Sequence, residues 1–231
     1  MAEETVNKLP GTAPLNELTD QLHERRSKAK LGGGLAKIEA QHERGKLTAR
    51  ERLDLLVDPG TFNEIGIHGR PHYSQPALKD KEAPADGVIT GWGDIEGRTC
   101  AIVAYDFTVM AGSMGQTGEV KVTRIREMAL QKRMPLVWLL DSAGARIQEA
   151  AGSLFAGSGH LFREEVQMSG VVPMGAAMMG PCAAGTAYIP GLADFVPMVV
   201  GQGAMALAGP HLTKAVTGEE ISMEDLGGAK V

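Results

Sequence analysis

Short apolar runs that alternate with helical patterns from residue 87 to residue 200 restrict the fold more than any other feature of this chain. Two β-type runs, 88–92 and 99–104, are joined by Asp94-Ile95-Glu96-Gly97, which is typical of a hairpin. Strand-like runs follow at 135–140, 171–178 and 195–200, and helical patterns lie at 119–133, in the stretch up to Met168, and at 181–189. Strands separated by helices and small-residue turns predict an α/β fold with a largely parallel sheet.

The composition indicates a globular protein and excludes several classes of site. Hydrophobic residues make up 43% of the 231 residues and charged residues 22%, and the net charge of −5 argues against general nucleic-acid binding. Two cysteines are too few for a disulfide framework or a four-cysteine zinc ribbon, and the six histidines show no ligand spacing, so we expect no metal in this chain. The polar start and the interrupted apolar runs predict no signal peptide, no membrane span and a cytoplasmic location.

The first 60 residues differ in pattern from the remainder. Residues 1–14 are predicted to form a loose tail, and 15–44 a charged surface helix interrupted by Gly32-Gly33-Gly34. No strand precedes these glycines and no Gly-Lys-Ser/Thr follows them, which favours a hinge over a phosphate loop. Thr48-Ala49-Arg50-Glu51 is a capping box that begins another helix. We therefore expect a helical arm at 15–60 and one domain at 61–231.

Two small-residue turns follow predicted strands, where ligands of α/β proteins are commonly bound. In the first, Asp141 or Ser142 is interpreted as a helix N-cap; Ser142 as a nucleophile lacks an identifiable partner. The second is MGPCAAGTAY, residues 179–188, with a helix expected after Pro181. Its first amides would lack intrahelical partners and could form an oxyanion hole, although close helix–strand packing is the simpler interpretation. Cys182 fits a small buried thiol better than a nucleophile.

Two other candidates receive the plainer interpretation. His160 lies in a helical pattern beside Phe162 and Arg163, so a structural or exposed position is favoured over a catalytic base. A basic set on the predicted helix 119–133 could contact phosphates, but a solvated helix face is at least as good an explanation; its members are Lys121, Arg124, Arg126, Lys132 and Arg133.

A series of motifs in fixed order resembles the biotin-dependent acyl-CoA carboxyltransferases, the β subunits of propionyl-CoA and acetyl-CoA carboxylases. The motifs are GKLTARERLDLL at 45–56, Asp106-Phe107-Thr108-Val109 ahead of Gly112-Ser113, DSAGARIQEA at 141–150, SGVVPMGAAMMGPCAAGTAY at 169–188, Ala193-Asp194-Phe195, and GPHLTKAVTGEEISMEDLGG at 209–228. The resemblance extends from about residue 18 to the C-terminus. It implies a crotonase-like ββα superhelix with an N-terminal helical arm.

The resemblance covers only the N-terminal, acyl-CoA-binding domain of such subunits. It implies that a second carboxyltransferase half, which binds carboxybiotin, is a partner, and that this chain is a fragment or one half of a split subunit. A biotin carboxylase and biotin carrier are further implied partners, and the full-length form is expected to be a homo-oligomer. The implied substrate is a short-chain acyl-CoA, with propionyl-CoA favoured.

The implied mechanism uses no side-chain base. The family releases carbon dioxide from carboxybiotin, the biotin anion removes the α-proton of the thioester, and backbone N–H groups hold the enolate that attacks carbon dioxide. Carried over by motif, those N–H groups belong to Ala184 and Gly185. The candidate substrate-binding residues are Gly112, Ser113, Ser142, Ala143, Gly144, Ala145, Arg146, Cys182 and Ala183.

Three positions depart from the family pattern. Ala184 replaces the first glycine of GPCAGG, Ala143 replaces a glycine of DSGGAR, and Gly118 stands where many members have histidine. An alanine at 184 is strained if that backbone needs a positive φ. These departures bear on the acyl group accepted more than on the reaction class.

Three alternative functions stay open at this point. The chain could belong to a biotin-dependent methylmalonyl-CoA decarboxylase or transcarboxylase, or it could be a non-catalytic CoA-binding fragment. A hydratase or isomerase of the crotonase superfamily would need a positioned acid, and no Asp or Glu adjoins residues 179–188 in sequence.

Overall fold

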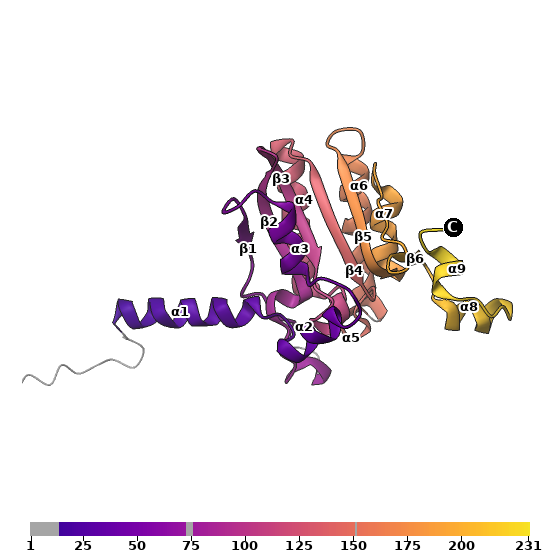
Figure 1. The fold of residues 1–231 in the computed structure, drawn as a ribbon, viewed down its shortest axis with the longest axis horizontal. Helices are drawn as coiled ribbons and strands as arrows, with labels where there is room; N and C mark the ends of the chain where they lie inside the picture. Colours follow the sequence, from indigo (N-terminus) through magenta and orange to yellow (C-terminus); the bar gives the residue numbers. More distant parts are fainter. Residues whose placement is uncertain (1–13, 73–75, 151) are drawn as a thin grey trace, which may run out of the picture.

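The computed structural model describes residues 14–72, 76–150 and 152–231 (Figure 1). The tail expected at 1–14 lies, apart from Pro14, outside the described residues. None of the helices in the described ranges combines the length and the apolar character that a bilayer crossing requires.

The N-terminal region is helical, as predicted, and its helices are α1 (Leu15–Lys30), α2 (Leu35–His42) and α3 (Ala49–Leu56). α1 buries none of its residues and projects away from the rest of the molecule in Figure 1. The predicted capping box is present, because Glu51 N donates to Thr48 Oγ1 at 3.3 Å and Thr48 N donates to Glu51 Oε2 at 2.7 Å. These bonds satisfy amides that the first turn of α3 would otherwise leave unpaired.

One mixed sheet organises the remainder of the chain, with its strands in sequence order. The strands are β1 (Asn63–Ile65), β2 (Val88–Ile95), β3 (Arg98–Tyr105), β4 (Leu136–Ser142), β5 (Met174–Ala183) and β6 (Ala204–Ala206). The predicted hairpin is the β2–β3 pair, and β1 also pairs antiparallel with β2. The pairs from β3 to β6 are parallel, as the helices between them require.

Helices and short 3₁₀ segments connect these strands. The α-helices are α4 (Gln116–Lys132), α5 (Ile147–Ala150), α6 (Gly159–Met168), α7 (Tyr188–Leu192), α8 (Pro210–Thr217) and α9 (Met223–Gly227). The 3₁₀ segments are η1 (Pro76–Leu78), η2 (Pro84–Gly87), η3 (Met110–Gly112), η4 (Gly152–Ser158) and η5 (Ala184–Ala187). In Figure 1, α3 lies on one side of the sheet and α4 and α6 on the other.

Strand β4 shows how the sheet is buried on both faces. Trp138 and Leu140 belong to the core cluster that includes residues of α4 and α6, whereas Leu139 belongs to the cluster that includes residues of α3. All three side chains are buried. A strand covered on both faces is expected to be apolar throughout, which explains its continuous hydrophobic run.

The structure corrects two sequence predictions near the C-terminal strands. Pro181 does not begin a helix: it lies in β5, paired with Ala204, and the helical turn starts at Ala184. Residues 195–200 are not a strand; they meet β5 in isolated bridges, such as Met178 with Met198. Pro197 has no N–H to donate to a ladder, although its carbonyl accepts from Met178 N at 2.8 Å. Strand β6 was not predicted.

Candidate active site

A cavity of about 740 Å³ lies between α4, α6 and the two small-residue turns. The first turn reaches its wall through Ala145 and the second through Gly185. Apolar walls are provided partly by Phe162 and Tyr188, whose rings meet edge to face with centroids 4.7 Å apart. Apolar walls with a few polar groups are typical of small-molecule sites. We call this space the α4–α6 cavity.

Ser142 holds the first turn together rather than facing the cavity. Its hydroxyl donates to Gly112 O at 2.7 Å and accepts from Gly144 N at 3.1 Å, and the residue is fully buried. The N-cap interpretation is wrong for Ser142, because its hydroxyl closes the turn at the end of β4 while α5 begins only at Ile147; no side-chain base among the described residues bonds to the hydroxyl. Asp141, the other cap candidate, instead bonds to the helical arm, as described below.

Glycines bring the two turns into backbone contact. A Cβ at Gly144, which has φ +94°, would lie 2.4 Å from Ala183 O in the second turn. A Cβ at Gly112, at φ +60°, would lie 2.4 Å from Asp141 O. Any larger residue would force these segments apart, so Gly144 allows the two turns to approach closely and Gly112 allows η3 to approach the end of β4.

Arg146 anchors the first turn through a buried network. Its guanidinium donates to Asp86 Oδ1 at 2.5 Å, to Glu149 Oε1 at 3.2 Å and, through Nε, to Ser113 Oγ at 3.1 Å. Asp86 also accepts from Gly118 N at 2.6 Å in the first turn of α4. Burial raises the pKa of Asp86 while Arg146 opposes that shift. With 2% of its surface exposed, Arg146 can position the turn but does not present its guanidinium to a ligand.

The second turn begins where β5 gives way to η5. Ala184 has φ +50°, the left-handed conformation that the departure from glycine put in question. No side chain caps η5, and the first amides of a 3₁₀ segment have no partner within it. The thiol of Cys182 is buried, donates to Thr186 O at 3.2 Å, and has its pKa raised to about 12 by burial. Cys182 is therefore a protonated packing residue at neutral pH.

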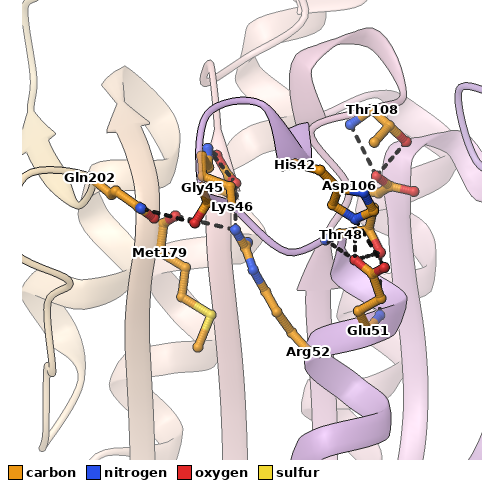
Figure 2. A network of polar contacts seen from close by, with 11 residues as sticks. His42, Gly45, Lys46, Thr48, Glu51, Arg52, Asp106, Thr108, Met179 and Gln202 are labelled. Atoms are coloured by element: carbon orange, nitrogen blue, oxygen red, sulfur yellow. Dashed lines mark hydrogen bonds and ion pairs between the residues drawn. The ribbon is translucent and has the colours of Figure 1, made fainter. Parts of the chain in front are cut away.

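A polar network on the other side of the sheet ties the helical arm to the ends of β4 and β5 (Figure 2). Lys46 Nζ lies 2.7 Å from Asp141 Oδ1, and Arg52 Nη2 donates to Asp141 Oδ2 at 3.1 Å and to Met179 O at 3.3 Å. Gln202 donates to Gly45 O at 3.2 Å. Sequence reasoning assigned no role to Lys46 or Arg52, although both lie inside the 45–56 motif.

A second buried cluster, missed at the sequence level, lies beneath the α4–α6 cavity. Arg126 Nε is 2.6 Å from Glu164 Oε2, and its guanidinium nitrogens are 3.7 Å from Glu119 Oε2 and Glu165 Oε1. Tyr105 donates to Glu119 at 3.1 Å. Burial raises the pKa of Glu165 to about 8. Glu119 and Glu164 line the same cavity as Glu149 and Gly185, so this cavity contains carboxylates although none lies near Gly185 in sequence.

His160 and the basic residues of α4 have different surroundings. His160 lines the α4–α6 cavity from α6. The predicted basic face of α4 is not continuous, because Lys121 and Arg126 are buried; Lys121 Nζ donates to Ala85 O at 2.7 Å and to Val88 O. Within the described ranges, no group of three or more His, Cys, Asp or Glu side chains could hold a metal ion.

Comparison with known proteins identifies the family. A model of the carboxyl transferase domain matches residues 40–231. The chain belongs to the carboxyl transferase domain family. It is 45% identical over 215 residues to the propionyl-CoA carboxylase beta chain of Roseobacter denitrificans, and 44% identical over 217 residues to the methylmalonyl-CoA decarboxylase subunit alpha of Veillonella parvula. These alignments cover 93% and 94% of this chain and 42% of each relative.

Solved structures agree with this assignment and with the crotonase-like fold. The transcarboxylase 12S structure, with methylmalonyl-coenzyme A and methylmalonic acid bound, has a TM-score of 0.90 and 41% sequence identity. It matches over 95% of this chain and 42% of its own. The beta subunit of geranyl-CoA carboxylase from P. aeruginosa has a TM-score of 0.71. The chain thus spans about two fifths of the length of the relatives it matches.

Proposed function

We propose that this chain is the acyl-CoA-binding part of a biotin-dependent carboxyltransferase, which moves a carboxyl group from carboxybiotin to the α-carbon of a short-chain acyl-CoA, with propionyl-CoA favoured. The observation that carries the proposal is the meeting of two small-residue turns at one wall of the α4–α6 cavity, where Gly185 follows the left-handed Ala184. Family membership and the names of the relatives support the substrate class.

The proposed chemistry assigns position and electrostatics to this chain. The amides of Ala184 and Gly185 would hold the thioester oxygen as negative charge develops on it, a contribution commonly worth several kcal/mol. Small residues at Ala143, Ala145 and Ala183 would let the thioester approach the backbone. The remaining candidate residues would shape the site by holding its backbone; they are Gly112, Ser113, Ser142, Gly144, Arg146 and Cys182. Carboxybiotin, bound by a partner, would supply the carboxyl group and the base.

The organisation and partners form part of the same proposal. We infer a helical arm at 15–60 and an acyl-CoA-binding domain at 61–231, completed by a second carboxyltransferase half and by a biotin carboxylase with its carrier. The relatives named as subunits, including a transcarboxylase 12S solved as a hexamer, support a multi-subunit assembly that contains a homo-oligomer. A methylmalonyl-CoA decarboxylase or transcarboxylase is the second candidate, because relatives with those names are equally similar.

Binding and turnover test the proposal in two steps. We expect the chain alone to bind propionyl-CoA by calorimetry and to carboxylate it negligibly. Addition of a second carboxyltransferase half should give transfer between methylmalonyl-CoA and free biotin without ATP. Absence of acyl-CoA binding would overturn the function, and carboxylation by the chain alone would overturn the need for the second half.

Three observations distinguish the alternative functions. Crotonyl-CoA hydration tests the hydratase alternative, which the carboxylates of the α4–α6 cavity keep open to experiment. The identity of the subunit that copurifies with the complete protein, a biotin carboxylase or a membrane pump, distinguishes a carboxylase from a decarboxylase. Acyl-CoA binding without transfer in the presence of the second half would indicate a non-catalytic CoA-binding fragment.

A further inference from the structure

Strand β5 leaves regular pairing directly before the turn that forms one wall of the α4–α6 cavity. Leu140 pairs with Met178, and the next pair is Ser142 with Cys182. Asp141 alone lies between these pairs on β4, whereas residues 179–181 lie between them on β5. Such a bulge changes the direction of a strand and is common beside active sites. Its shape therefore sets where Ala184 and Gly185 lie relative to the first turn.

Charged side chains from the helical arm hold this bulge. The carboxylate of Asp141 passes directly over Gly180, because a Cβ there would lie 1.9 Å from Asp141 Oδ1 and 2.7 Å from Lys46 Nζ. Arg52 bonds to the same carboxylate and to the carbonyl of Met179, inside the bulge. A single ion cluster thus fills the space where a side chain at Gly180 would lie and also binds the carbonyl of Met179.

The cluster is buried, so its three charges depend on one another. Asp141 is 1% exposed, Arg52 7% and Lys46 9%. Burial raises the pKa of Asp141 and lowers the pKa of Lys46, and in each case the ion pair opposes the shift. Removal of one partner from a buried ion cluster leaves an uncompensated charge, which is far more disruptive than the loss of an exposed pair.

We propose that Lys46 and Arg52 are positioning residues for the acyl-CoA site and that they act through Asp141. They fix the β5 bulge, and the bulge fixes the distance between the Ala143–Ala145 turn and the Ala184–Gly185 turn. The helical arm is therefore part of the machinery that shapes a site on the opposite side of the sheet. The positioning role rests on the structure alone, and its consequence for ligand binding rests on the proposed function.

Amide hydrogen exchange tests the positioning role without a ligand. The reporters are Ala143 N, which donates to Ala111 O at 2.9 Å, and Gly144 N and Arg146 N, which bond to Ser142 Oγ and Met114 O. In Lys46→Met, we expect protection at these amides to fall about tenfold or more at pH values where Asp141 is ionised. In the wild type, protection should fall as pH is lowered and Asp141 takes up a proton, because the carboxylate charge that both cations hold is then lost.

Matched variants separate the ion cluster from general loosening. The variant Asp141→Asn removes the carboxylate that both Lys46 and Arg52 bind, so it should lower protection of the reporters at every pH. Lys28→Met is the control, because Lys28 and Glu82 form a pair whose side chains are 70% and 78% exposed. The other charged or titratable groups near Asp141 are Arg52, Asp106 and Cys182. Of these, Cys182 is protonated throughout because its pKa is about 12.

Two results would overturn the proposal: a Lys46→Met variant that loosens only residues 42–52, or a folded Asp141→Asn variant that keeps the wild-type turn protection. If Lys46→Met does not fold, Asp141→Asn still decides, because the proposal has both cations act through that carboxylate. Propionyl-CoA affinity is measured in parallel and should follow the pattern of protection. If the wild-type chain binds no acyl-CoA, the proposed function fails, while the exchange result still decides the role of Lys46 and Arg52.

Discussion

Two buried arginines flank the α4–α6 cavity, and their surroundings neutralise negative charge in different ways. Arg146 shares Asp86 and Glu149 with backbone amides at the start of α4, since Gly118 N bonds to Asp86 and Gln116 N bonds to Glu149. Arg126 faces Glu119, Glu164 and Glu165. Neither carboxylate oxygen of Glu165 has a hydrogen-bond partner among the described residues. One network uses helix amides, and the other has an excess of carboxylates without such donors.

The difference follows from where each network meets a helix. The N-terminus of α4 presents unpaired N–H groups and the positive end of the helix dipole, which stabilise carboxylates. Glu164 and Glu165 lie inside α6, where the N–H groups are already bonded within the helix. A buried carboxylate without donors lowers its free energy by binding a proton instead. We therefore expect the Arg146 network to be a rigid anchor and the Arg126 cluster to titrate near neutral pH.

The largest expected effect is that of Arg146→Met. The substitution leaves Asp86 and Glu149 buried beside each other without their shared cation, so we expect a loss of about 3–5 kcal/mol in the free energy of unfolding. Urea unfolding measures the loss. Arg124→Met changes an exposed arginine on α4 and should alter the free energy by about 0.5 kcal/mol or less. A loss below about 1 kcal/mol in Arg146→Met would contradict the description of this network as an anchor.

Glu165→Gln should reveal the titrating cluster through the pH dependence of stability. Burial raises the pKa of Glu165 to about 8 in the folded protein, above its ordinary value of 4.5, so the folded state binds the extra proton. The stability that this proton uptake adds is fully present below the ordinary pKa of 4.5, and it is lost as pH rises from there towards 8. The wild type should therefore lose up to about 1.4 kcal/mol per pH unit in this window relative to Glu165→Gln.

Unfolding at several pH values, with exposed Glu127→Gln as the matched control, measures this slope. Parallel curves for the wild type and Glu165→Gln would show that Glu165 is ionised in the fold and would remove the distinction between the two arginine networks. Stability of Glu127→Gln should change with pH as that of the wild type does, because this side chain is exposed in the folded protein as well as in the unfolded chain.

The contrast also shows what the sequence could predict. The β2–β3 hairpin, the Thr48 capping box and the apolar run of β4 depend on neighbouring residues, so local patterns sufficed. The motifs placed both turns of the candidate site, and the strain expected at Ala184 is present as φ +50°. These features involve residues close together in the chain.

The features that sequence reasoning missed join distant residues. Lys46 and Asp141 are 95 positions apart, and Arg146 and Asp86 are 60 apart, so no local pattern signals either pair. Pro181 was assigned to a helix because proline is common in first helical turns, but here a bulge accommodates it in β5. Strand β6, with three residues, is too short to have a periodicity.

The smallest effect on stability is expected at the uncharged wall between the two networks. Ala184→Gly relieves the left-handed strain at φ +50° but makes the unfolded chain more flexible, so the net change should stay within about 1 kcal/mol. Its methyl group lies 3.4 Å from the position that a Cβ at Gly144 would take, between the two turns. Loss of this methyl frees space between the two turns beside Gly185 and should shift the propionyl-CoA to butyryl-CoA affinity ratio towards butyryl-CoA by up to about tenfold.

Ala111→Gly is the matched control, because Ala111 has φ +55° but lies in η3, away from the η5 turn that reaches the α4–α6 cavity through Gly185. It should give a similar change in stability with no change in the affinity ratio, measured by calorimetry with both acyl-CoA substrates. An unchanged ratio in Ala184→Gly would remove the methyl group from the determinants of acyl preference. A changed ratio in Ala184→Gly but not in Ala111→Gly would show that the uncharged wall between the two turns selects the ligand. The two charged networks would then serve to hold that wall in place.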